Sequence, residues 1–562
     1  MKFIIIGGVA GGATAAARIR RIDEKAEITM IEKRHHISYA NCGLPYYLGN
    51  VISDRKKLFV KTASDFKTRF NIDVKIQTEA LSIDPENKTV LVSNPDGNTE
   101  NLHYDKLLLS PGAEPFIPKL KGIKMGGIFT LRNVGDTDTI KNYIQTKKVK
   151  KAVIVGGGFI GLEMAENFKK DGIDVTIVEL ADQVMGPLDF CMASLVRGNL
   201  LKNGVKLMLN EQVDSFSANE VKGDSDINVT LHSGKNISAD IVILSIGVHP
   251  NTTLAKKADI KIGVTKGIWV DEYLQTSVKD IYAVGDAIEY PHPLTGHPWL
   301  NYLAGPANRQ ARVAATNMVR GNTETYEGSI GTSIAKIFDQ NVAVTGLVGK
   351  KLKKLNIKFK ATTTCSSSNA DYYPGALKLA IKLTFSIPDG KLLGAQVVGH
   401  QGVDKRIDQL AMLIKRGGTV QDLMKVEHAY APPFSSAKDP IAIAGYVATN
   451  VLTGEMDILN WKEMYNTLHG KGSVKNLRIL DIRTKKEVED DPVKGTDNIP
   501  LDDLRNRIGE LDPLQPVLVY CVVGLRGYLA YRILKGNGFK EVYNLTGGMK
   551  IYESAIAALE NK

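Results

Sequence analysis

The sequence predicts an α/β protein built from several domains. A strand, a glycine-rich turn and a helix follow one another twice in the N-terminal third of the chain, and a later strand runs into a loop that begins at Cys521. A chain of 562 residues is too long for one hydrophobic core and suggests three or four domains of ordinary size. We therefore expect parallel sheets covered by helices.

The first strand, turn and helix lie at the N-terminus. Lys2 to Ile6 is a short apolar run typical of a buried parallel strand, and an alanine-rich helix is expected through Arg21. The next strand, Ile28 to Ile31, ends at Glu32. Glycine lets the backbone approach a pyrophosphate, the helix N-terminus supplies oriented amides, and a strand-end carboxylate accepts from a ribose hydroxyl. The candidate ligands are Gly7, Gly8, Val9, Ala10, Gly12 and Glu32.

The same order recurs further along the chain. A strand is expected over Ala152 to Val155, a helix through Lys170, and a second strand over Val175 to Val178. The candidate ligands are Gly156, Gly158, Gly161 and, at the end of the second strand, Glu179. Two copies in full context are much stronger than one glycine motif, so the sequence predicts two Rossmann-like dinucleotide-binding domains.

The first copy is the less regular one, because Val9 stands where the middle glycine usually lies. Its support comes from Asp280 to Ala287, which we interpret as a strand running into a helix. This arrangement would place Asp286 to bind a ribityl chain or a water on the pyrophosphate.

The composition indicates intracellular redox chemistry. The four cysteines, at positions 42, 191, 365 and 521, have neither the spacing of paired zinc ligands nor that of a disulfide framework, as expected in a reducing cytoplasm. No apolar stretch is long enough for a membrane span. The net charge of +11 is spread along the chain without a long polybasic tract, which favours a phosphate-bearing ligand over nucleic acid.

The two dinucleotide folds, the Tyr282 to Ala287 segment and the sequence around Cys42 together resemble the flavin-dependent pyridine nucleotide-disulfide reductases, over residues 1 to about 450. The resemblance implies FAD on the first fold, with Glu32 and Asp286 among its ligands, and a nicotinamide cofactor on the second. Glu179 favours NADH, because a carboxylate suits the 2'-hydroxyl and repels a 2'-phosphate.

Cys42 narrows the choice within that superfamily. Members of the disulfide type carry two cysteines separated by four residues, whereas Ile37 and Tyr47 occupy those positions here. Cys42 must then form a mixed disulfide, a persulfide or a sulfenic acid. The segment His36 to Gly49 resembles coenzyme A disulfide reductases and their persulfide-reducing relatives, in which this cysteine faces the flavin. We expect a helix N-terminus and the flavin to favour its thiolate.

The same resemblance implies further site residues. Arg18 and Arg21 lie one turn apart on the first helix, where they could meet the phosphates of coenzyme A, and a solvated charged face is the alternative for Arg18. The positions that would touch the pantetheine or nucleotide are Ser38, Asn41, Lys438 and, less regularly in the family, Asn308.

Two aromatic segments resemble those that family members lend across a dimer interface to the partner's active site. They are Asp371 to Gly375 and His428 to Ser436. Tyr430, and either Tyr372 or its neighbour Tyr373, would donate a proton or hydrogen bond to the leaving thiolate, with interfacial packing as the alternative. His428 is expected to be a hydrogen-bonded structural residue rather than a base.

The last hundred residues or so are expected to form a separate unit that resembles a single-domain rhodanese. The six residues from Cys521 to Arg526 form a loop between a strand, Val517 to Tyr520, and a helix. The loop amides can surround the cysteine sulfur, Arg526 would fix this cradle, and the helix dipole would favour a thiolate or persulfide. Related phosphatases use a longer loop, so six residues favour sulfane sulfur.

The expected fold is thus α/β, with two Rossmann-like domains for FAD and NADH, an α+β dimerisation domain and an α/β rhodanese domain. The expected boundaries are 1–115 with 247–325 for FAD, 116–246 for NADH, 326–452 for dimerisation, 453–468 for a linker and 469–562 for the rhodanese domain.

The implied protein is a cytoplasmic homodimer without nucleic-acid, membrane or metal partners. It would use NADH, FAD and coenzyme A to reduce persulfides or polysulfides at Cys42, with sulfane sulfur arriving through Cys521. Three alternatives stay open: a coenzyme A disulfide reductase, an NADH oxidase or peroxidase, and a sulfurtransferase hub that delivers sulfur to a partner protein.

Overall fold

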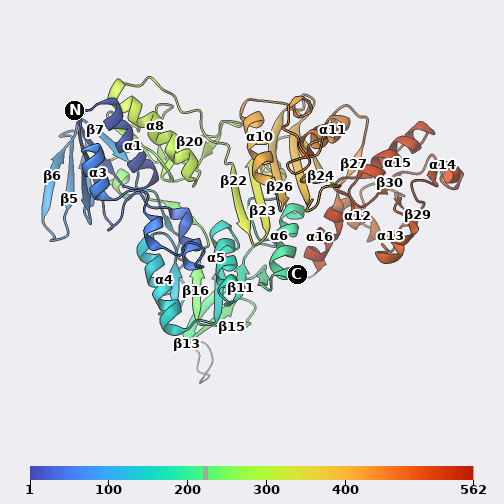
Figure 1. Cartoon of the computed structure of the whole chain (residues 1–562), viewed down its shortest axis with the longest axis horizontal. Helices are drawn as coiled ribbons and strands as arrows, with labels where there is room; N and C mark the ends of the chain where they lie inside the picture. Colours follow the sequence, from blue (N-terminus) through green and yellow to red (C-terminus); the bar gives the residue numbers. More distant parts are fainter. Residues whose placement is uncertain (219–225, 561–562) are drawn as a thin grey trace. The chain divides into compact units, whose positions relative to one another are not determined.

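The computed structural model describes residues 1–218 and 226–560, and the chain divides into two compact units (Figure 1). The first contains Met1–Leu180 and Glu211–Gly331, and the second contains Ala181–Asn210 and Thr332–Lys562. The predicted α/β class is confirmed, because parallel sheets, an antiparallel sheet and covering helices all occur.

The first unit contains a parallel five-stranded sheet in the order β19-β7-β1-β2-β3. Its central strand β1 carries the apolar run Phe3 to Ile6, which is buried throughout. Helices α1 and α8 pack against each other beside this sheet (Figure 1). The bounds are β1 Lys2–Ile6, β2 Glu27–Glu32, β3 Asp73–Ile76, β7 Lys106–Leu109, β19 Ile281–Ala283, α1 Ala10–Ile22 and α8 Ala304–Arg320.

A second parallel arrangement in the same unit repeats this plan, with neighbouring strands in the order β11-β10-β16-β9. Each turn after a central strand therefore reaches a helix N-terminus at the carboxyl edge of a sheet, which is where such folds bind nucleotides. The bounds are β9 Ile128–Thr130, β10 Lys151–Val155, β11 Asp174–Glu179, β16 Ile241–Leu244, α4 Val134–Lys147 and α5 Phe159–Lys170.

Smaller elements complete the first unit. Two three-stranded antiparallel sheets follow the orders β4-β5-β6 and β13-β14-β15. Their bounds are β4 Glu79–Asp84, β5 Thr89–Ser93, β6 Thr99–His103, β13 Val213–Ala218, β14 Ile227–Leu231 and β15 Asn236–Ala239. The short helices are α2 Leu44–Leu48, α3 Ala63–Phe70 and α7 Thr253–Lys257.

The second unit begins with an antiparallel five-stranded sheet in the order β22-β23-β26-β25-β24. Helix α10 packs on β23 and β26, and α11 packs on β24, so the sheet has helical cover (Figure 1). The bounds are β22 Ser333–Ile337, β23 Gln340–Gly346, β24 Phe359–Ser367, β25 Lys378–Ser386, β26 Leu392–Gly399, α6 Phe190–Lys202, α9 Gly349–Lys354, α10 Val403–Lys415 and α11 Pro440–Leu452.

A parallel sheet in the order β27-β31-β30-β28-β29 forms the C-terminal part of this unit. The stretch 453–468, which we expected to be a linker, contains β27, which pairs with β31, and α12, whose Met464 is fully buried in this core. The bounds are β27 Ile458–Leu459, β28 Arg478–Asp481, β29 Asp497–Asn498, β30 Val517–Tyr520, β31 Val542–Leu545, α12 Trp461–Leu468, α13 Lys485–Asp490, α14 Leu504–Arg507, α15 Leu525–Gly536 and α16 Gly548–Glu560.

One predicted element is wrong. The segment Asp280 to Ala287 does not run from a strand into a helix: β19 is followed by a turn at Gly285, with a φ of 85°, and then by strand β20, Ile288–Pro291. The left-handed Gly285 places a turn where a helix was expected to begin, and the buried apolar residues after it continue as a strand. None of the helices in residues 1–218 and 226–560 has the length and apolar character needed to cross a bilayer.

Candidate functional site

The first glycine turn joins β1 to α1 and lines a cavity of about 250 Å³. Gly7 has a φ of 99°, and a Cβ on Gly12 would lie 1.7 Å from the Gly7 carbonyl oxygen, so both positions require glycine. At the end of β2, the Glu32 carboxylate accepts from the Gly8 and Arg34 N–H groups, each at 3.0 Å. Burial raises the pKa of Glu32, while these two N–H groups lower it.

This arrangement fits the ribose and phosphates of FAD. The cavity is lined by the turn residues Gly7, Gly8 and Val9 together with Glu32, so the open backbone and the carboxylate face the same space. Ala10, another candidate, begins α1. Ser110 and Arg132, which also line this cavity, were missed because they lie far along the sequence from the glycine motif.

The second glycine turn, between β10 and α5, has the same geometry. Gly156 has a φ of 106°, and a Cβ on Gly161 would lie 2.1 Å from the Gly156 carbonyl oxygen. Gly158, in contrast, has no heavy atom within 4 Å of an added Cβ, which leaves open space beside the start of α5. Glu179, at the end of β11, accepts from the Gly157 N–H at 2.7 Å. The turn therefore fits the pyrophosphate and ribose of a nicotinamide dinucleotide.

Asp286 lies in the turn after β19 rather than at a helix. Its carboxylate is 3.5 Å from the guanidinium of Arg132. Burial raises the pKa of Asp286, and the positive charge of Arg132 opposes this shift.

Cys42 lies in a single 3-10 turn, Asn41–Gly43, directly before α2. Its thiol is free and its side chain is exposed. The neighbouring Asn41 has a buried Oδ1 atom without a hydrogen-bond partner within the described residues, which marks unmet polar capacity beside the thiol.

The charges around Cys42 differ from the sequence-based expectation. Although Cys42 is exposed at the surface, the protein atoms packed around it partly desolvate the thiol and raise its pKa. The carboxylates of Glu163 and Asp286 raise it further, while Arg132 lowers it. These effects oppose the expected stabilisation of the thiolate, which stays a prediction for the protein with its flavin bound. The helix that follows, α2, has only 5 residues, so its dipole is small against two carboxylates.

Glu163 on α5 is a titratable group beside Cys42 that sequence reasoning missed. Burial raises its pKa to about 7, the nearby Glu166 carboxylate adds to this shift, and a hydrogen bond with Tyr46 opposes it. No local pattern could reveal this cluster, because Tyr46 and Cys42 reach it from a segment far earlier in the sequence. The only signal was a pair of acids on the helix after the second glycine turn.

The two arginines proposed for coenzyme A differ in environment. Arg18 has a buried Nε atom without a hydrogen-bond partner in the described part of the chain, and burial followed by Arg312 lowers its pKa. Arg21 is exposed on the same helix. Asn308, on α8, accepts from the Thr14 hydroxyl on α1 at 2.6 Å. Sequence analysis did not point to Arg312, which lies one helical turn beyond Asn308 on α8 and acts on the pKa of Arg18.

The remaining substrate candidates are not brought together within one unit. Ser38 lies in the first unit with a φ of 46°, and its carbonyl accepts from the Val60 N–H at 2.9 Å. Lys438 lies in the second unit and is exposed.

The two aromatic segments of the second unit lie side by side. The Ala370 N–H donates to the Pro432 carbonyl at 3.3 Å, and the hydroxyls of Tyr372 and Tyr430 are 2.9 Å apart. Tyr372 is 75% exposed and Tyr430 is 48% exposed. The expectation of a hydrogen-bonded His428 is wrong, since both ring nitrogens are buried without a partner among the described residues.

The C-terminal thiol, Cys521, directly follows β30 and is 1% exposed. The helix α15 begins at Leu525, so Arg526 lies in its first turn rather than in the loop. Gly524, with a φ of 102°, directs its N–H to the Cys521 Sγ at 3.1 Å. A left-handed glycine thus turns a loop amide towards the sulfur.

Arg526 is fixed by a partner that the sequence did not indicate. Its two terminal nitrogens each lie 2.7 Å from an oxygen of Glu487 on α13. This pairing lowers the pKa of Glu487 to about 2, chiefly through the hydrogen bonds from Arg526. The only signal for Glu487 was its place three residues after Thr484, a capping pattern that the structure also contains.

Comparison with known proteins agrees with this architecture. The pyridine nucleotide-disulphide oxidoreductase family matches residues 1–317, its dimerisation domain matches 332–440, and the rhodanese-like domain matches 460–555. A coenzyme A disulfide reductase of Staphylococcus aureus is 36% identical over 448 residues, which are 80% of this chain and 99% of the relative.

Two solved structures cover nearly the whole chain. Reduced Bacillus anthracis CoADR-RHD has a TM-score of 0.95 at 44% identity, covering 99% of this chain and 98% of the other. An NAD-dependent persulfide reductase from A. fulgidus has a TM-score of 0.91 at 36% identity, covering 98% and 100%. The chain therefore belongs to the FAD-dependent pyridine nucleotide-disulphide oxidoreductases and carries a dimerisation domain and a C-terminal rhodanese-like domain.

Proposed function

We propose that the protein is an NADH-dependent reductase of persulfides and polysulfides, with coenzyme A persulfide as the substrate at Cys42. The observation that carries the proposal is the presence, in one chain, of a lone exposed thiol beside a dinucleotide fold and a second thiol in a rhodanese loop. The likeness to an NAD-dependent persulfide reductase over 98% of the chain supports the same substrate class.

In this proposal, Cys42 accepts sulfur rather than forming an internal disulfide. Its thiolate attacks the terminal sulfur of coenzyme A persulfide, which releases the coenzyme A thiolate and leaves a persulfide on Cys42. Two electrons then cleave the S–S bond, giving hydrosulfide and the Cys42 thiolate. FAD, when bound, would supply these electrons from NADH, which becomes NAD⁺ and a proton.

The protein residues have separate tasks. We assign FAD to Gly7, Gly8, Val9, Ala10, Gly12, Glu32 and Asp286, and NADH to Gly156, Gly158, Gly161 and Glu179. Arg18, Arg21, Ser38, Asn41, Asn308 and Lys438 would bind coenzyme A. The unpartnered buried atoms of Arg18 and Asn41 support this assignment, because buried polar groups are normally hydrogen-bonded.

Cys521 would supply the sulfur. The Cys521 thiolate attacks the outer sulfur of a polysulfide, whose S–S bond breaks to release the polysulfide shortened by one sulfur. The coenzyme A thiolate then attacks this outer sulfur on Cys521, which releases the Cys521 thiolate and forms coenzyme A persulfide. The Gly524 amide at the sulfur and the fixed Arg526 support a cradle for this anionic intermediate.

The proposal includes a homodimer whose partner subunit lends Tyr372 and Tyr430 to the site. Their exposure and the match to a dimerisation domain support this arrangement. We likewise retain the predicted domain boundaries as part of the proposal, except that β27 and α12, within the predicted linker 453–468, pack with the rhodanese domain.

Coenzyme A disulfide reduction is the second candidate, because the Staphylococcus aureus relative matches 80% of this chain. Anaerobic NADH consumption with coenzyme A persulfide, coenzyme A disulfide and polysulfide, beside an aerobic run, separates the candidates. The proposal requires the highest kcat/KM on the persulfide. A preference for the disulfide selects the second candidate, and a preference for oxygen contradicts both.

A matched thiol variant controls this experiment. Burial raises the pKa of Cys365 to about 12, so this thiol stays protonated and unreactive at neutral pH. Cys365→Ser should therefore leave the persulfide rate unchanged, whereas Cys42→Ser should abolish it.

A further inference from the structure

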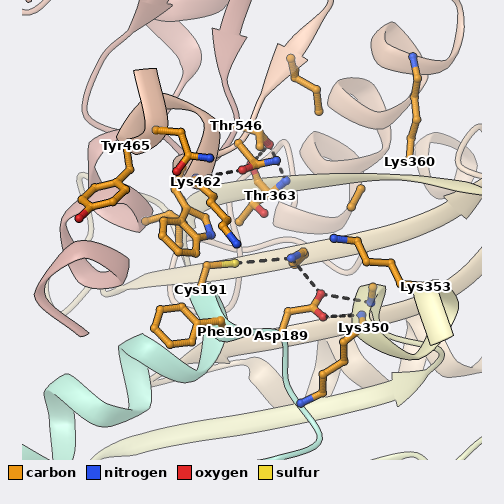
Figure 2. Close-up of a pocket in the computed structure, with 18 of the residues that line it drawn as sticks. Asp189, Phe190, Cys191, Lys350, Lys353, Lys360, Thr363, Lys462, Tyr465 and Thr546 are labelled. Atoms are coloured by element: carbon orange, nitrogen blue, oxygen red, sulfur yellow. Dashed lines mark hydrogen bonds and ion pairs between the residues drawn. The ribbon is translucent and has the colours of Figure 1, made fainter. Parts of the chain in front are cut away.

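A second large cavity, of about 1060 Å³, lies within the second unit, and neither Cys42 nor Cys521 lines it. Its walls come from the start of α6, helix α9, strands β24 and β25 and helix α12 (Figure 2). We call it the lysine cavity, because five lysines and only three aspartates line it. They are Lys350, Lys353, Lys360, Lys382 and Lys462, with Asp182, Asp189 and Asp457.

The carboxylate of Asp189 is already compensated. It accepts from the Gly349 and Lys350 N–H groups at 3.2 and 3.0 Å, and it forms a 2.9 Å ion pair with Lys382. The same Lys382 ammonium also lies 3.5 Å from the Cys191 sulfur. Burial lowers the pKa of Lys382, but Cys191 and Asp189 outweigh this, so the amine stays charged. Because Lys382 and the two N–H groups already compensate the charge of Asp189, this carboxylate does not neutralise the other lysines of the cavity.

The remaining lysines fall into two groups. Lys350 donates to the Gly186 carbonyl and Lys360 to the Val451 carbonyl, and Figure 2 shows both amines directed away from the centre. Lys353 and Lys462, from α9 and α12, point towards each other across the space above Cys191 (Figure 2). Within residues 1–218 and 226–560, neither side-chain amine has an ion pair or hydrogen bond, and the hydrogen bond of Lys462 to Asn460 is made by its backbone N–H. Two unpaired cations thus face the same part of the cavity from opposite sides (Figure 2).

One wall of the lysine cavity is aromatic. Phe190 and Trp461 stack with ring centroids 5.5 Å apart at 25°, and Tyr465 lies one turn beyond Trp461 on α12. Flat apolar surface beside a cluster of cations suits a ligand with a planar ring and a separate anionic group. The volume of the lysine cavity, about 1060 Å³, also exceeds what a single small anion needs.

We propose that the lysine cavity binds a phosphorylated ligand of nucleotide size, with its phosphates between Lys353 and Lys462 and its ring against the Phe190 and Trp461 wall. A phosphate there neutralises two facing cations, which lowers their mutual repulsion and replaces water by charge-assisted hydrogen bonds. This site is additional to the coenzyme A residues assigned above, and it does not depend on the proposed reaction.

Calorimetric titration of the FAD-loaded protein, with NAD⁺ saturating the second dinucleotide fold, tests the proposal. ADP and inorganic tripolyphosphate are the probes. Lys353→Glu and Lys462→Glu should each weaken ADP binding by at least about tenfold, since each removes a charge-assisted contact and adds repulsion. Lys354→Glu is the matched control, because Lys354 is exposed on the same helix and does not line the cavity.

The outcomes are distinct. Tighter binding of ADP than of tripolyphosphate, lost in both cavity variants and kept in Lys354→Glu, supports the proposal. Equal binding of the two probes, binding unchanged in the cavity variants, or no binding at millimolar ADP overturns it. Lys353→Gln and Lys462→Gln repeat the test with a smaller change, and both residues are exposed, so the variants should melt like the parent protein.

Discussion

At the scale of single residues, two carboxylates and one cation act on the Cys42 thiol, and the carboxylates are the stronger influence. Glu163 and Asp286 both raise the pKa of Cys42, and Glu163 itself has a pKa raised to about 7 by burial. At neutral pH, Glu163 thus passes between its neutral and charged forms. We expect the reactivity of Cys42 to depend on this neighbour.

Glu163→Gln should make Cys42 more reactive. Above pH 7 the native carboxylate is charged and holds the thiol in its protonated form, whereas glutamine is neutral at every pH. The midpoint of the pH dependence of iodoacetamide alkylation should therefore move to lower pH, with a rate at pH 8 about threefold higher. Peptide mass spectrometry of the FAD-loaded protein gives the rate at Cys42. An unchanged or higher midpoint would contradict this electrostatic account.

The rhodanese loop depends on a different carboxylate. Glu487 has a pKa lowered to about 2, so it stays charged and holds Arg526 at any pH above about 4. Since the folded-state pKa is below the unfolded value, the stability from this pair is complete above pH 4.5 and is lost only as the pH falls towards 2.

Glu487→Gln should lower sulfurtransferase activity about tenfold, because Arg526 loses its anchor. The melting temperature should change little, since the side chains are 31% and 35% exposed and exposed pairs contribute below about 1 kcal/mol. Glu510→Gln breaks the Arg507–Glu510 pair of the same domain and serves as the control. Equal losses of activity in both variants would show that Glu487 has no specific role.

At the scale of elements, the second glycine turn contains one glycine that the fold requires and one that only a bound ligand would require. A Cβ added to Gly161 would lie 2.1 Å from the Gly156 carbonyl oxygen, so the fold has no room for a side chain there. Gly158 faces open space, so its absence of a side chain matters only when a ligand approaches.

Gly158→Ala should fold normally and bind NADH poorly. We expect an unchanged melting temperature and a KM for NADH raised about tenfold, because the added methyl group meets the pyrophosphate. Gly161→Ala should instead lower the melting temperature, with a destabilisation of about 1 to 3 kcal/mol. Differential scanning calorimetry and steady-state kinetics measure both. A normal KM in Gly158→Ala would contradict the placement of the nucleotide.

Local sequence patterns predicted the elements that build these turns. The strand Val517 to Tyr520 was predicted at its observed bounds, and the strand predicted over Ile28 to Ile31 extends by one residue at each end. Apolar runs and glycine turns are local signals, so they suffice for such elements. Asp280 to Ala287 was mispredicted because a single left-handed glycine decides whether the chain enters a helix or makes a turn into another strand.

At the scale of the whole molecule, the site could be predicted only where a motif carries it. Cys42 and Cys521 stand in recognisable motifs, whereas Glu163, Glu487 and the lysine cavity depend on side chains that the fold brings together from distant segments. The raised pKa of Cys42 is likewise a property of tertiary burial and charge, and no spacing of residues encodes it.

In the proposed reaction two thiols act in sequence: Cys521 accepts sulfane sulfur, and Cys42 later carries it as a persulfide that is reduced to hydrosulfide. Anaerobic NADH consumption by Cys521→Ser, with polysulfide plus coenzyme A in one assay and preformed coenzyme A persulfide in the other, tests it most directly. We predict that the polysulfide rate falls at least about tenfold while the persulfide rate is kept. Equal rates of the variant and the parent protein on polysulfide would contradict the account.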